Sequence, residues 1–283
     1  MRITITGAAG MLGRDLAAVL SSSPQQHQLH LIDIQECDIT GRGQVRACLE
    51  AARPQLVIHA AAYTNVDGAE SDAESALRVN AEGARNVALA AAEIGARLIY
   101  ISTDYVFDGC RDRPYVEDDR PNPLNVYGRS KWLGECAAGE HPDSLVVRTA
   151  WLYGRHGRHF PGAILEQARQ GGPLRVVNDQ TGCPTWTRDL AQGLAGLLGG
   201  GRGTLHLAGG GSCTWYGFAL AVLEEVGKRE PLPPVAVEPM STAELGRAAP
   251  RPRYSVLESN RLAELGLAPL PHWRDALGRF FSE

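Results

Sequence analysis

The sequence predicts an α/β fold in which a doubly wound parallel sheet is followed by a smaller C-terminal lobe. Three observations lead to this prediction. Short apolar, β-branched runs alternate with longer amphipathic stretches rich in Ala and Leu, as in consecutive β–α–β units. The first of these runs leads directly into a glycine-spaced turn, "GAAGMLG". Beyond Arg148 the spacing loosens and Gly, Pro and aromatic residues become frequent, which indicates a second, less regular unit.

Seven segments have the length and the composition of buried parallel strands. They are Ile3–Thr6, Leu29–Asp33, Leu56–Ala60, Arg97–Ser102, Leu145–Arg148, Leu174–Val177 and Thr204–Leu207. Stretches that predict helices lie between most of them, for example Gly13–Ser21, Ala73–Ile94 and Pro123–Ala138. We therefore expect a Rossmann sheet domain, which binds the cofactor, in residues 1–150 and about 173–208. Residues of about 151–172 and 209–283 should form the substrate lobe, with the binding site in the crevice between the two units.

The composition is that of an ordinary globular protein. The 283 residues are 44% hydrophobic and 21% charged, and the net charge of −4 comes from interspersed acidic and basic residues. No basic face indicates binding to nucleic acid or to an anionic membrane. No apolar run reaches 18 residues, and "MRITITGAAG" is too polar for a signal peptide. Six cysteines without a CxxC pair fit a reducing compartment, so we expect a cytoplasmic protein.

The segment "ITITGAAGMLGRDL" combines a strand, a glycine-rich turn and the start of a helix. Gly7 permits the tight turn, Gly10 lets a pyrophosphate approach the backbone, and Gly13 allows the helix to pack closely on the strand. The N–H groups at the helix start then face the phosphates. Asp33 ends the second strand, where a carboxylate binds the adenosine ribose hydroxyls. Because this carboxylate would repel a 2′-phosphate, we expect NAD(P)H as cofactor, with NADH favoured over NADPH.

Two further segments lie where the rings of such a cofactor would pass. Asp38 and Ile39 are candidates to flank the adenine, and a polar loop without that role explains them equally well. Ala60–Ala62, in "HAAAYTNVD" after the third strand, offer small side chains beside a flat ring. Close packing of a helix on the sheet explains the same alanines equally well.

The segment "YGRSK" places Tyr127 and Lys131 four residues apart in a predicted helix, so both lie on one face of it. The chain has 26 arginines and only two lysines, which makes chance a poor explanation for this pair. A neighbouring ammonium favours the phenolate, so we expect the pKa of Tyr127 to lie below its usual value. Lys131 also offers three donors to the ribose hydroxyls on the nicotinamide side. The alternative is a tyrosine and a surface lysine on a solvated helix.

Hydroxyl groups follow the fourth predicted strand, in "YISTDYVFDG". Ser102 and Thr103 lie at the carboxyl edge of the sheet, which is where ligands bind in open α/β folds. Thr103 can donate a hydrogen bond to a substrate oxygen as that oxygen gains charge. A Ser-Thr pair at a strand end is also common as a turn or a helix cap, so its meaning depends on Tyr127.

Together, GxxGxxG, STD and YxxxK are similar to the motifs of the extended short-chain dehydrogenase/reductase superfamily. More narrowly, "STDYVFDG", "NPLNVYGRSKWLGE", "RTAWLYG", "NDQTGCPTW" and "RPRYSVL" resemble the dTDP-4-dehydrorhamnose reductase family, as far as about residue 262. The resemblance implies that NAD(P)H reduces the C4 ketone of dTDP-4-dehydro-L-rhamnose, a dTDP-linked keto-deoxysugar, to give dTDP-L-rhamnose.

The resemblance also implies a role for individual residues. Tyr127 would be the catalytic acid, Lys131 its helper and Thr103 the third member, while Asp104 and Trp151 would contact the nucleotide-sugar. The cofactor would be held by Gly10, Met11, Leu12, Asp33, Asp38, Ile39, Ala61, Ala62 and Tyr63. Gly7 and Gly13 of the turn, Ser102 at the strand end, and the Tyr127–Lys131 pair complete the predicted cofactor site.

Other functions stay open from the sequence alone. A sugar-nucleotide dehydratase is disfavoured, because it carries Glu where this chain has Tyr105. A reductase or epimerase of another nucleotide-deoxysugar remains possible, as does a cofactor-binding regulatory subunit like the β-subunit of methionine adenosyltransferase. A homodimer and a divalent ion at generic carboxylates such as Asp15 are also left open.

Two charged features have no predicted chemical role. "RHGRH" holds His156 and His159 between arginines, and this composition indicates a phosphate-facing or solvated loop rather than a metal site, so no metal ligand is predicted. Glu135 is expected to be a charge on the exposed face of its helix.

Overall fold

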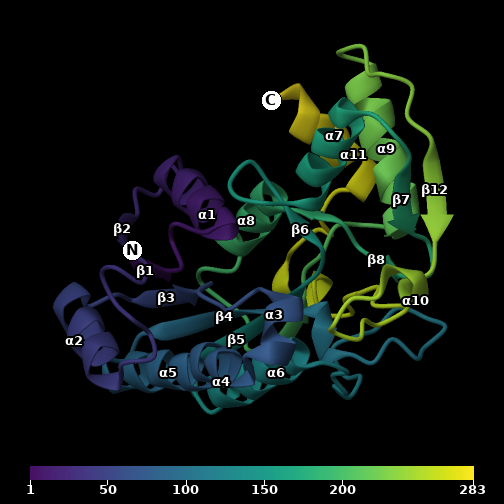
Figure 1. Cartoon of the computed structure of the whole chain (residues 1–283). Helices are drawn as coiled ribbons and strands as arrows, with labels where there is room; N and C mark the ends of the chain where they lie inside the picture. Colours follow the sequence, from purple (N-terminus) through teal and green to yellow (C-terminus); the bar gives the residue numbers. More distant parts are fainter.

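A parallel sheet of six strands forms the centre of the computed structural model, which describes residues 1–283 (Figure 1). The strands lie in the order β10–β5–β4–β3–β1–β2, and every neighbouring pair is parallel. Their bounds are β1 Arg2–Thr6, β2 Gln28–Ile32, β3 Leu56–His59, β4 Arg97–Thr103, β5 Ser144–Thr149 and β10 Gly203–His206. The order reverses between β1 and β3, so the loops that leave these strands diverge and open a crevice. The predicted doubly wound fold is confirmed.

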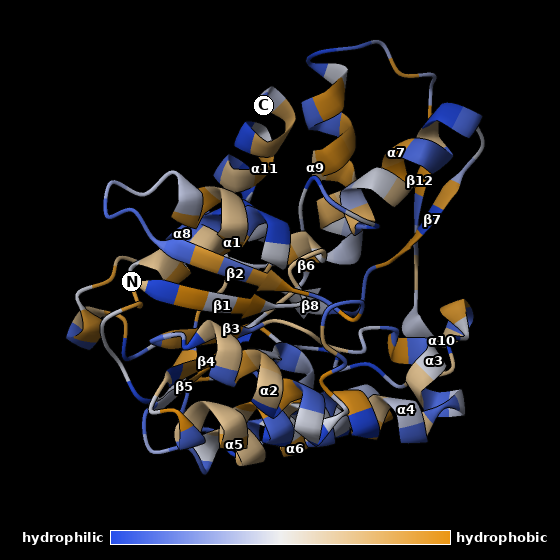
Figure 2. Cartoon of the chain, turned by 90° about the vertical axis from the view of Figure 1, so that its left-hand side faces the viewer, coloured by the Kyte–Doolittle hydropathy of each residue, from blue (hydrophilic) through white to orange (hydrophobic).

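Helices cover both faces of the sheet. α1 (Met11–Ser21) and α8 (Thr187–Ala195) pack on one face, and α2 (Arg42–Ala52), α5 (Ala84–Glu93) and α6 (Val126–Gly139) lie on the other (Figure 1). Successive side chains of a strand point to opposite faces, so each helical layer has its own apolar core. This double coverage explains why the strands are nearly continuous apolar runs in the sequence. Figure 2 shows hydrophobic and hydrophilic residues alternating along α5, whose apolar side packs on the sheet.

The predicted helix Ala73–Ile94 is one helical run with a change of geometry in its middle. It consists of α4 (Ala73–Leu77), a π-helical turn (Arg78–Gly83) and α5. A short helix, α3 (Val66–Ser71), precedes it. The periodicity of the sequence does not reveal the π turn, because a shift of one residue hardly changes the pattern of an alanine-rich segment.

The C-terminal lobe is built around an aromatic core. Tyr153 lies at its centre, with its ring centroid 5.5 Å from that of Phe218 and 5.3 Å from that of Phe280. Three helices surround this core: α7 Phe160–Gln170, α9 Trp215–Gly227 and α11 Trp273–Ser282. The remaining short elements are β6 Leu152–Tyr153, β7 Leu174–Val177, β8 Thr181–Gly182, β9 Thr185–Trp186, β11 Cys213–Thr214, β12 Val237–Met240, α10 Thr242–Leu245, and 3₁₀ turns at Asp104–Val106 and Ala263–Leu265. None of the helices combines the length and the apolar character needed to cross a bilayer.

The lobe stands at the carboxyl edge of the sheet. In Figure 2 the arrowheads of β1 and β2 point towards it. A small apolar core, which includes Phe107, Tyr115, Cys183 and Val256, joins the end of the sheet to segments of the lobe. The crevice at the strand ends is therefore bounded by both units.

The predicted strand Leu174–Val177 is confirmed as β7, but its assignment to the sheet domain is wrong. It pairs with β12 in a separate two-stranded sheet, and Leu174 and Val176 are buried in the lobe core with Phe218. A run of four residues with three apolar, branched side chains looks the same in either sheet, and its partner lies far along the chain. The other six predicted strands form the central sheet.

A substitution at Gly13 tests how tightly α1 packs on the turn that precedes it. A methyl group at Gly13 would lie 2.2 Å from the carbonyl oxygen of Gly7, so α1 would have to move. We expect Gly13→Ala to lower the free energy of unfolding by about 1–3 kcal/mol, measured by urea denaturation.

The matched control is Gly43→Ala, in the first turn of α2, because nothing lies within 4 Å of the added carbon. This variant should be as stable as the parent or up to about 1 kcal/mol more stable. Equal losses of stability in both variants would contradict the packing argument.

Candidate active site

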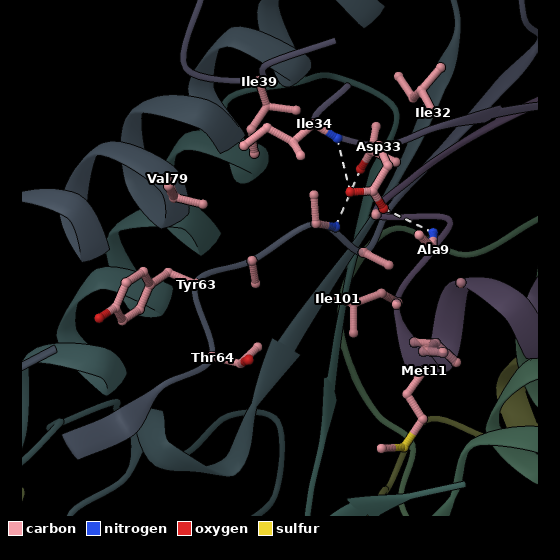
Figure 3. A pocket seen from close by; sticks show the side chains of 18 of the residues that line it. Ala9, Met11, Ile32, Asp33, Ile34, Ile39, Tyr63, Thr64, Val79 and Ile101 are labelled. Carbon is pink, nitrogen blue, oxygen red and sulfur yellow. Dashed lines mark hydrogen bonds between the residues drawn. The ribbon is translucent and has the colours of Figure 1, made fainter. Parts of the chain in front are cut away.

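A cavity of about 820 Å³ opens at the carboxyl edge of the sheet (Figure 3). Its volume lies in the range of small-molecule and cofactor sites. Its wall contains every residue predicted to hold a cofactor, namely Gly7, Gly10, Met11, Leu12, Gly13, Asp33, Asp38, Ile39, Ala61, Ala62, Tyr63, Ser102, Tyr127 and Lys131. These residues lie in separate parts of the chain, and the parallel strands bring them to one edge.

The glycine turn forms one side of the cavity. Gly7 has a φ of +68°, and a side chain there would lie 2.7 Å from the backbone of Ala61. Gly10 precedes the first turn of α1, which has neither a side-chain cap nor an acidic residue. The free N–H groups and the positive end of the helix dipole at this point favour an anion.

Two carboxylates border the adenosine end of the predicted site. Asp33 accepts hydrogen bonds from the N–H groups of Ala9 and Ile34, each at 2.9 Å, and is thereby fixed at the end of β2 (Figure 3). Asp38 accepts from the N–H and the hydroxyl of Thr40, and these hydrogen bonds lower the pKa of Asp38. Both side chains are therefore held as oriented hydrogen-bond acceptors.

A buried amide that sequence reasoning missed holds the opposite wall. Asn80 lies in the π turn and is 1% exposed. Its side chain accepts from the N–H of Tyr63 at 2.8 Å and donates to the carbonyl of the same residue at 3.0 Å. It also donates to the hydroxyl of Ser130 on α6 at 2.9 Å. The wall around Tyr63 is therefore tied to the helix that carries the Tyr–Lys pair, and π turns are frequent at such functional positions.

Two glycines let α6 lie close to its neighbours. A side-chain carbon at Gly128 would be 2.1 Å from the carbonyl oxygen of Tyr105, and one at Gly134 would be 2.3 Å from that of Asn80. Any larger residue at either position would push α6 outwards. This close contact places the Tyr–Lys pair against the end of β4 and into the cavity wall.

Lys131 is buried, with 3% of its surface exposed. Its ammonium donates to the carbonyl of Ile101 at 2.7 Å and lies 4.3 Å from the centroid of the Tyr100 ring. Burial lowers the pKa of Lys131 to about 7, although the carboxylate of Glu135 acts in the opposite direction. Burial therefore destabilises the charged form of Lys131, and pKa shifts of this kind are common at functional sites.

The expectation that the pKa of Tyr127 is lowered is wrong for this structure. Burial raises the pKa of Tyr127 above its usual value, and a hydrogen bond with Thr103 offsets only part of this rise. Desolvation is the largest cause of the rise, because a phenolate needs more solvation than this position supplies, and the charge of Asp104 acts in the same direction. The phenol is therefore held in the protonated form, which suits a proton donor.

The residues predicted to meet the substrate lie outside the cavity wall. Thr103, at the end of β4, donates to a carboxylate oxygen of Asp104 at 3.1 Å. The other oxygen of Asp104 accepts from the hydroxyl of Ser255 in the C-terminal part of the chain. Burial raises the pKa of Asp104 to about 6 despite these hydrogen bonds. Because both oxygens are engaged inside the protein, contact of Asp104 with a sugar stays a prediction.

Trp151 follows β5 where the chain enters the lobe. It has a φ of +45°, which is unusual for a residue other than glycine. Its indole stacks on that of Trp215 in α9, with ring centroids 3.5 Å apart and planes 4° apart. Trp151 therefore joins the sheet domain to the lobe through a flat aromatic surface, and its contact with substrate stays a prediction.

Taken together, these features suit a dinucleotide. The glycine turn leaves no room for side chains beside a free helix N-terminus, Asp33 is fixed at one end, and a lysine and a tyrosine lie at the other.

Comparison with known proteins identifies the family. The chain matches the RmlD substrate binding domain model over residues 1–283. It belongs to this family. The membership confirms the resemblance seen in the sequence motifs.

Relatives of this RmlD family member cover almost its whole length. It is 44% identical over 281 residues to the dTDP-4-dehydrorhamnose reductase of Mycolicibacterium smegmatis, covering 98% of this chain and 84% of that protein. It is 41% identical over 285 residues to the dTDP-4-keto-6-deoxy-D-glucose reductase of Streptomyces niveus, covering 99% and 96%. The structure of Bacillus anthracis dTDP-4-dehydrorhamnose reductase in complex with NADP is similar with a TM-score of 0.94 at 41% identity, covering 99% and 98%.

Glu135 is not the exposed helix charge that the sequence indicated. It is 7% exposed and forms a bidentate ion pair with Arg148, at 2.9 and 2.7 Å, while accepting from Ser102 at 2.5 Å. Its partner Arg148 lies on β5, so the periodicity of the helix does not reveal that Glu135 faces the sheet.

In "RHGRH", His159 caps α7 by accepting from the N–H of Gly162 at 3.1 Å. The structure contains no group of three or more His, Cys, Asp or Glu side chains that could hold a metal ion.

Lys131→Met tests how much the buried ammonium lowers the free energy of unfolding. The pKa of Lys131 is about 7 in the folded state and higher in the unfolded state, so between these values the unfolded chain binds more protons. The wild type should therefore gain stability relative to the variant as the pH rises from 7 to 9, by up to about 1.4 kcal/mol per pH unit. Urea unfolding at pH 7, 8 and 9 measures this change.

Lys228→Met is the matched control because Lys228, the other lysine of the chain, is exposed and paired with Glu225. Its stability difference from the wild type should stay nearly constant over the same pH range. A constant difference for Lys131→Met as well would show that the ammonium is not destabilised by burial.

Proposed function

We propose that this protein is an NAD(P)H-dependent reductase that converts the C4 ketone of dTDP-4-dehydro-L-rhamnose to the alcohol of dTDP-L-rhamnose. The observation that carries the proposal is the position of Tyr127 and Lys131 in the wall of the same cavity as the glycine turn. Such a cavity holds a dinucleotide with its nicotinamide end beside a proton donor. The dTDP-sugar reductases among the relatives support the choice of substrate.

Three residues of this chain have separate roles in the proposed reduction. When bound, NAD(P)H supplies the hydride that reaches the carbonyl carbon. Tyr127 donates its phenolic proton to the carbonyl oxygen, and its raised pKa keeps that proton in place until the oxygen becomes basic. Thr103 donates a hydrogen bond to the same oxygen, and Lys131 balances the phenolate charge that remains. The three residues therefore protonate one oxygen and stabilise the charge left behind.

We propose that the lobe binds the nucleotide-sugar beside the Trp151–Trp215 stack, where the chain enters the lobe. A flat aromatic surface suits a pyrimidine or a deoxysugar face. The second candidate is reduction of another dTDP-keto-deoxysugar, which the Streptomyces niveus relative favours. An epimerase would recycle its cofactor within each turnover, and a regulatory subunit would show no turnover.

Tyr127→Phe tests the proton donor. We expect kcat to fall by about 10²- to 10⁴-fold, because Phe retains the packing and removes the acid. The measurement follows NADH oxidation at 340 nm, with dTDP-4-keto-6-deoxyglucose generated in situ and a 3,5-epimerase added or left out. Cofactor affinity, measured by titration calorimetry, should change little.

Tyr216→Phe is the control, because Tyr216 lies on α9 outside the cavity wall. Activity in Tyr127→Phe comparable to that of this control would exclude Tyr127 as the acid. Oxidation of NADH that does not need the epimerase would favour the second candidate over dTDP-L-rhamnose formation.

We also propose that NADH is preferred over NADPH, because the fixed carboxylate of Asp33 suits free ribose hydroxyls and repels a 2′-phosphate. Asp33→Ala should then raise the ratio of kcat/KM for NADPH to that for NADH by about tenfold, which is about 1.4 kcal/mol of discrimination. An unchanged ratio would show that Asp33 does not select the cofactor.

A further inference from the structure

Arg158 is a cation in the cavity wall to which no role is assigned above. Among the 25 residues that form the wall, Lys131 and Arg158 are the only two basic ones. Lys131 is engaged with the carbonyl of Ile101. The guanidinium of Arg158 is exposed and has no ion pair or side-chain hydrogen bond. A free arginine that faces a cavity is available to bind an anionic group of a ligand.

The loop that carries Arg158 lies against the start of α1. It runs between β6 and α7 as residues 154–159. A side-chain carbon at Gly154 would be 3.1 Å from Cγ of Met11, and one at Gly157 would be 4.0 Å from its Cε. Met11, seen in Figure 3, is the first residue of α1. Arg158 therefore projects from a loop that borders the free N–H groups of the helix N-terminus.

The loop is held at both ends while Arg158 itself stays free. At one end, the hydroxyl of Thr187 donates to the carbonyl of Tyr153 and to Asp15 of α1. Within the loop, Arg155 donates to the carbonyl of Phe280 at 3.2 Å. At the other end His159 caps α7. These contacts fix the position of the loop beside α1 without using the charge of Arg158.

We propose that Arg158 binds the diphosphate of the dinucleotide from the side of the lobe, opposite the glycine turn. The proposal rests on the proposed function, because it takes NAD(P)H as the occupant of the cavity. A diphosphate carries two negative charges, and no other unengaged cation lies in the wall. The planar fork of an arginine suits two phosphate oxygens at once. Arg158 would make the lobe part of the cofactor site.

The nucleotide-sugar also contains a diphosphate, and the experiment must separate the two sources. Binding of NADH, ADP and adenosine is measured by titration calorimetry on the full chain for the wild type, Arg158→Ala and Arg158→Lys. We expect Arg158→Ala to bind NADH and ADP about tenfold more weakly than the wild type does. The affinity of Arg158→Lys should lie between those of the wild type and Arg158→Ala. Adenosine, which lacks phosphate, should bind all variants equally.

Arg155→Ala is the matched control, since Arg155 lies in the same loop with the same charge and does not form part of the wall. Because the contact of Arg155 with Phe280 is only one of those that fix the loop, the affinity of this variant for NADH should fall much less than that of Arg158→Ala. An equal loss in both variants would show that loop placement, and not the charge of Arg158, matters, and would overturn the proposal. Unchanged NADH and ADP affinity in Arg158→Ala would also overturn it.

A second titration uses dTDP on the NADH-saturated protein. Weaker dTDP binding with unchanged NADH binding in Arg158→Ala would assign the arginine to the sugar nucleotide and reject the cofactor assignment. These binding experiments are independent of turnover. If the protein binds NADH through Arg158 but reduces no dTDP-keto-sugar, the proposed substrate fails while the role of Arg158 stands.

Discussion

The close approach of α6 to the elements around it is the constraint on which the catalytic end of the molecule depends. Gly128 and Gly134 are the points of contact, one against the turn after β4 and one against the π turn. Lys131 lies between these points and is buried, while Tyr127, directly before Gly128, is half-buried in the cavity wall. Any outward movement of α6 would admit water, and the pKa values of both groups would move back towards their usual values. The backbone contact therefore sets the chemistry of the side chains.

The two buried cations near the end of β4 are held in different ways. Arg148 has a bidentate carboxylate partner in Glu135, and the pair is neutral as a unit. Lys131 donates to a backbone carbonyl and lies on an aromatic face, and no carboxylate forms an ion pair with it. An ion pair holds elements together, whereas a buried ammonium without an ion-pair partner costs stability and is retained where function requires it. The contrast separates a structural pair from a functional group on the same helix.

Much of the sheet and of the cofactor wall could be predicted because local patterns determine them. Apolar runs mark the strands, and the glycine spacing around Gly7 and the Tyr127–Lys131 interval reflect close contacts within one turn or one helix. The failures depend on distant partners. The sheet to which β7 belongs depends on its pairing with β12, and the burial of Glu135 depends on its ion pair with Arg148 on β5. The two hydrogen bonds between the side chain of Asn80 and the backbone of Tyr63 form only when the chain folds, so no local pattern predicts them.

The path of the chain between the two units limits how they can move. It leaves the sheet after β5, returns for α8 and β10, and leaves again towards α9. Leu262 and Leu270 then pack in the core of the sheet domain before α11 closes the lobe. Because several connections and the packing of Leu262 and Leu270 would have to change together, this path opposes rotation of the lobe about a single hinge. A ligand that enters the open cavity therefore meets two bodies that keep a nearly constant orientation.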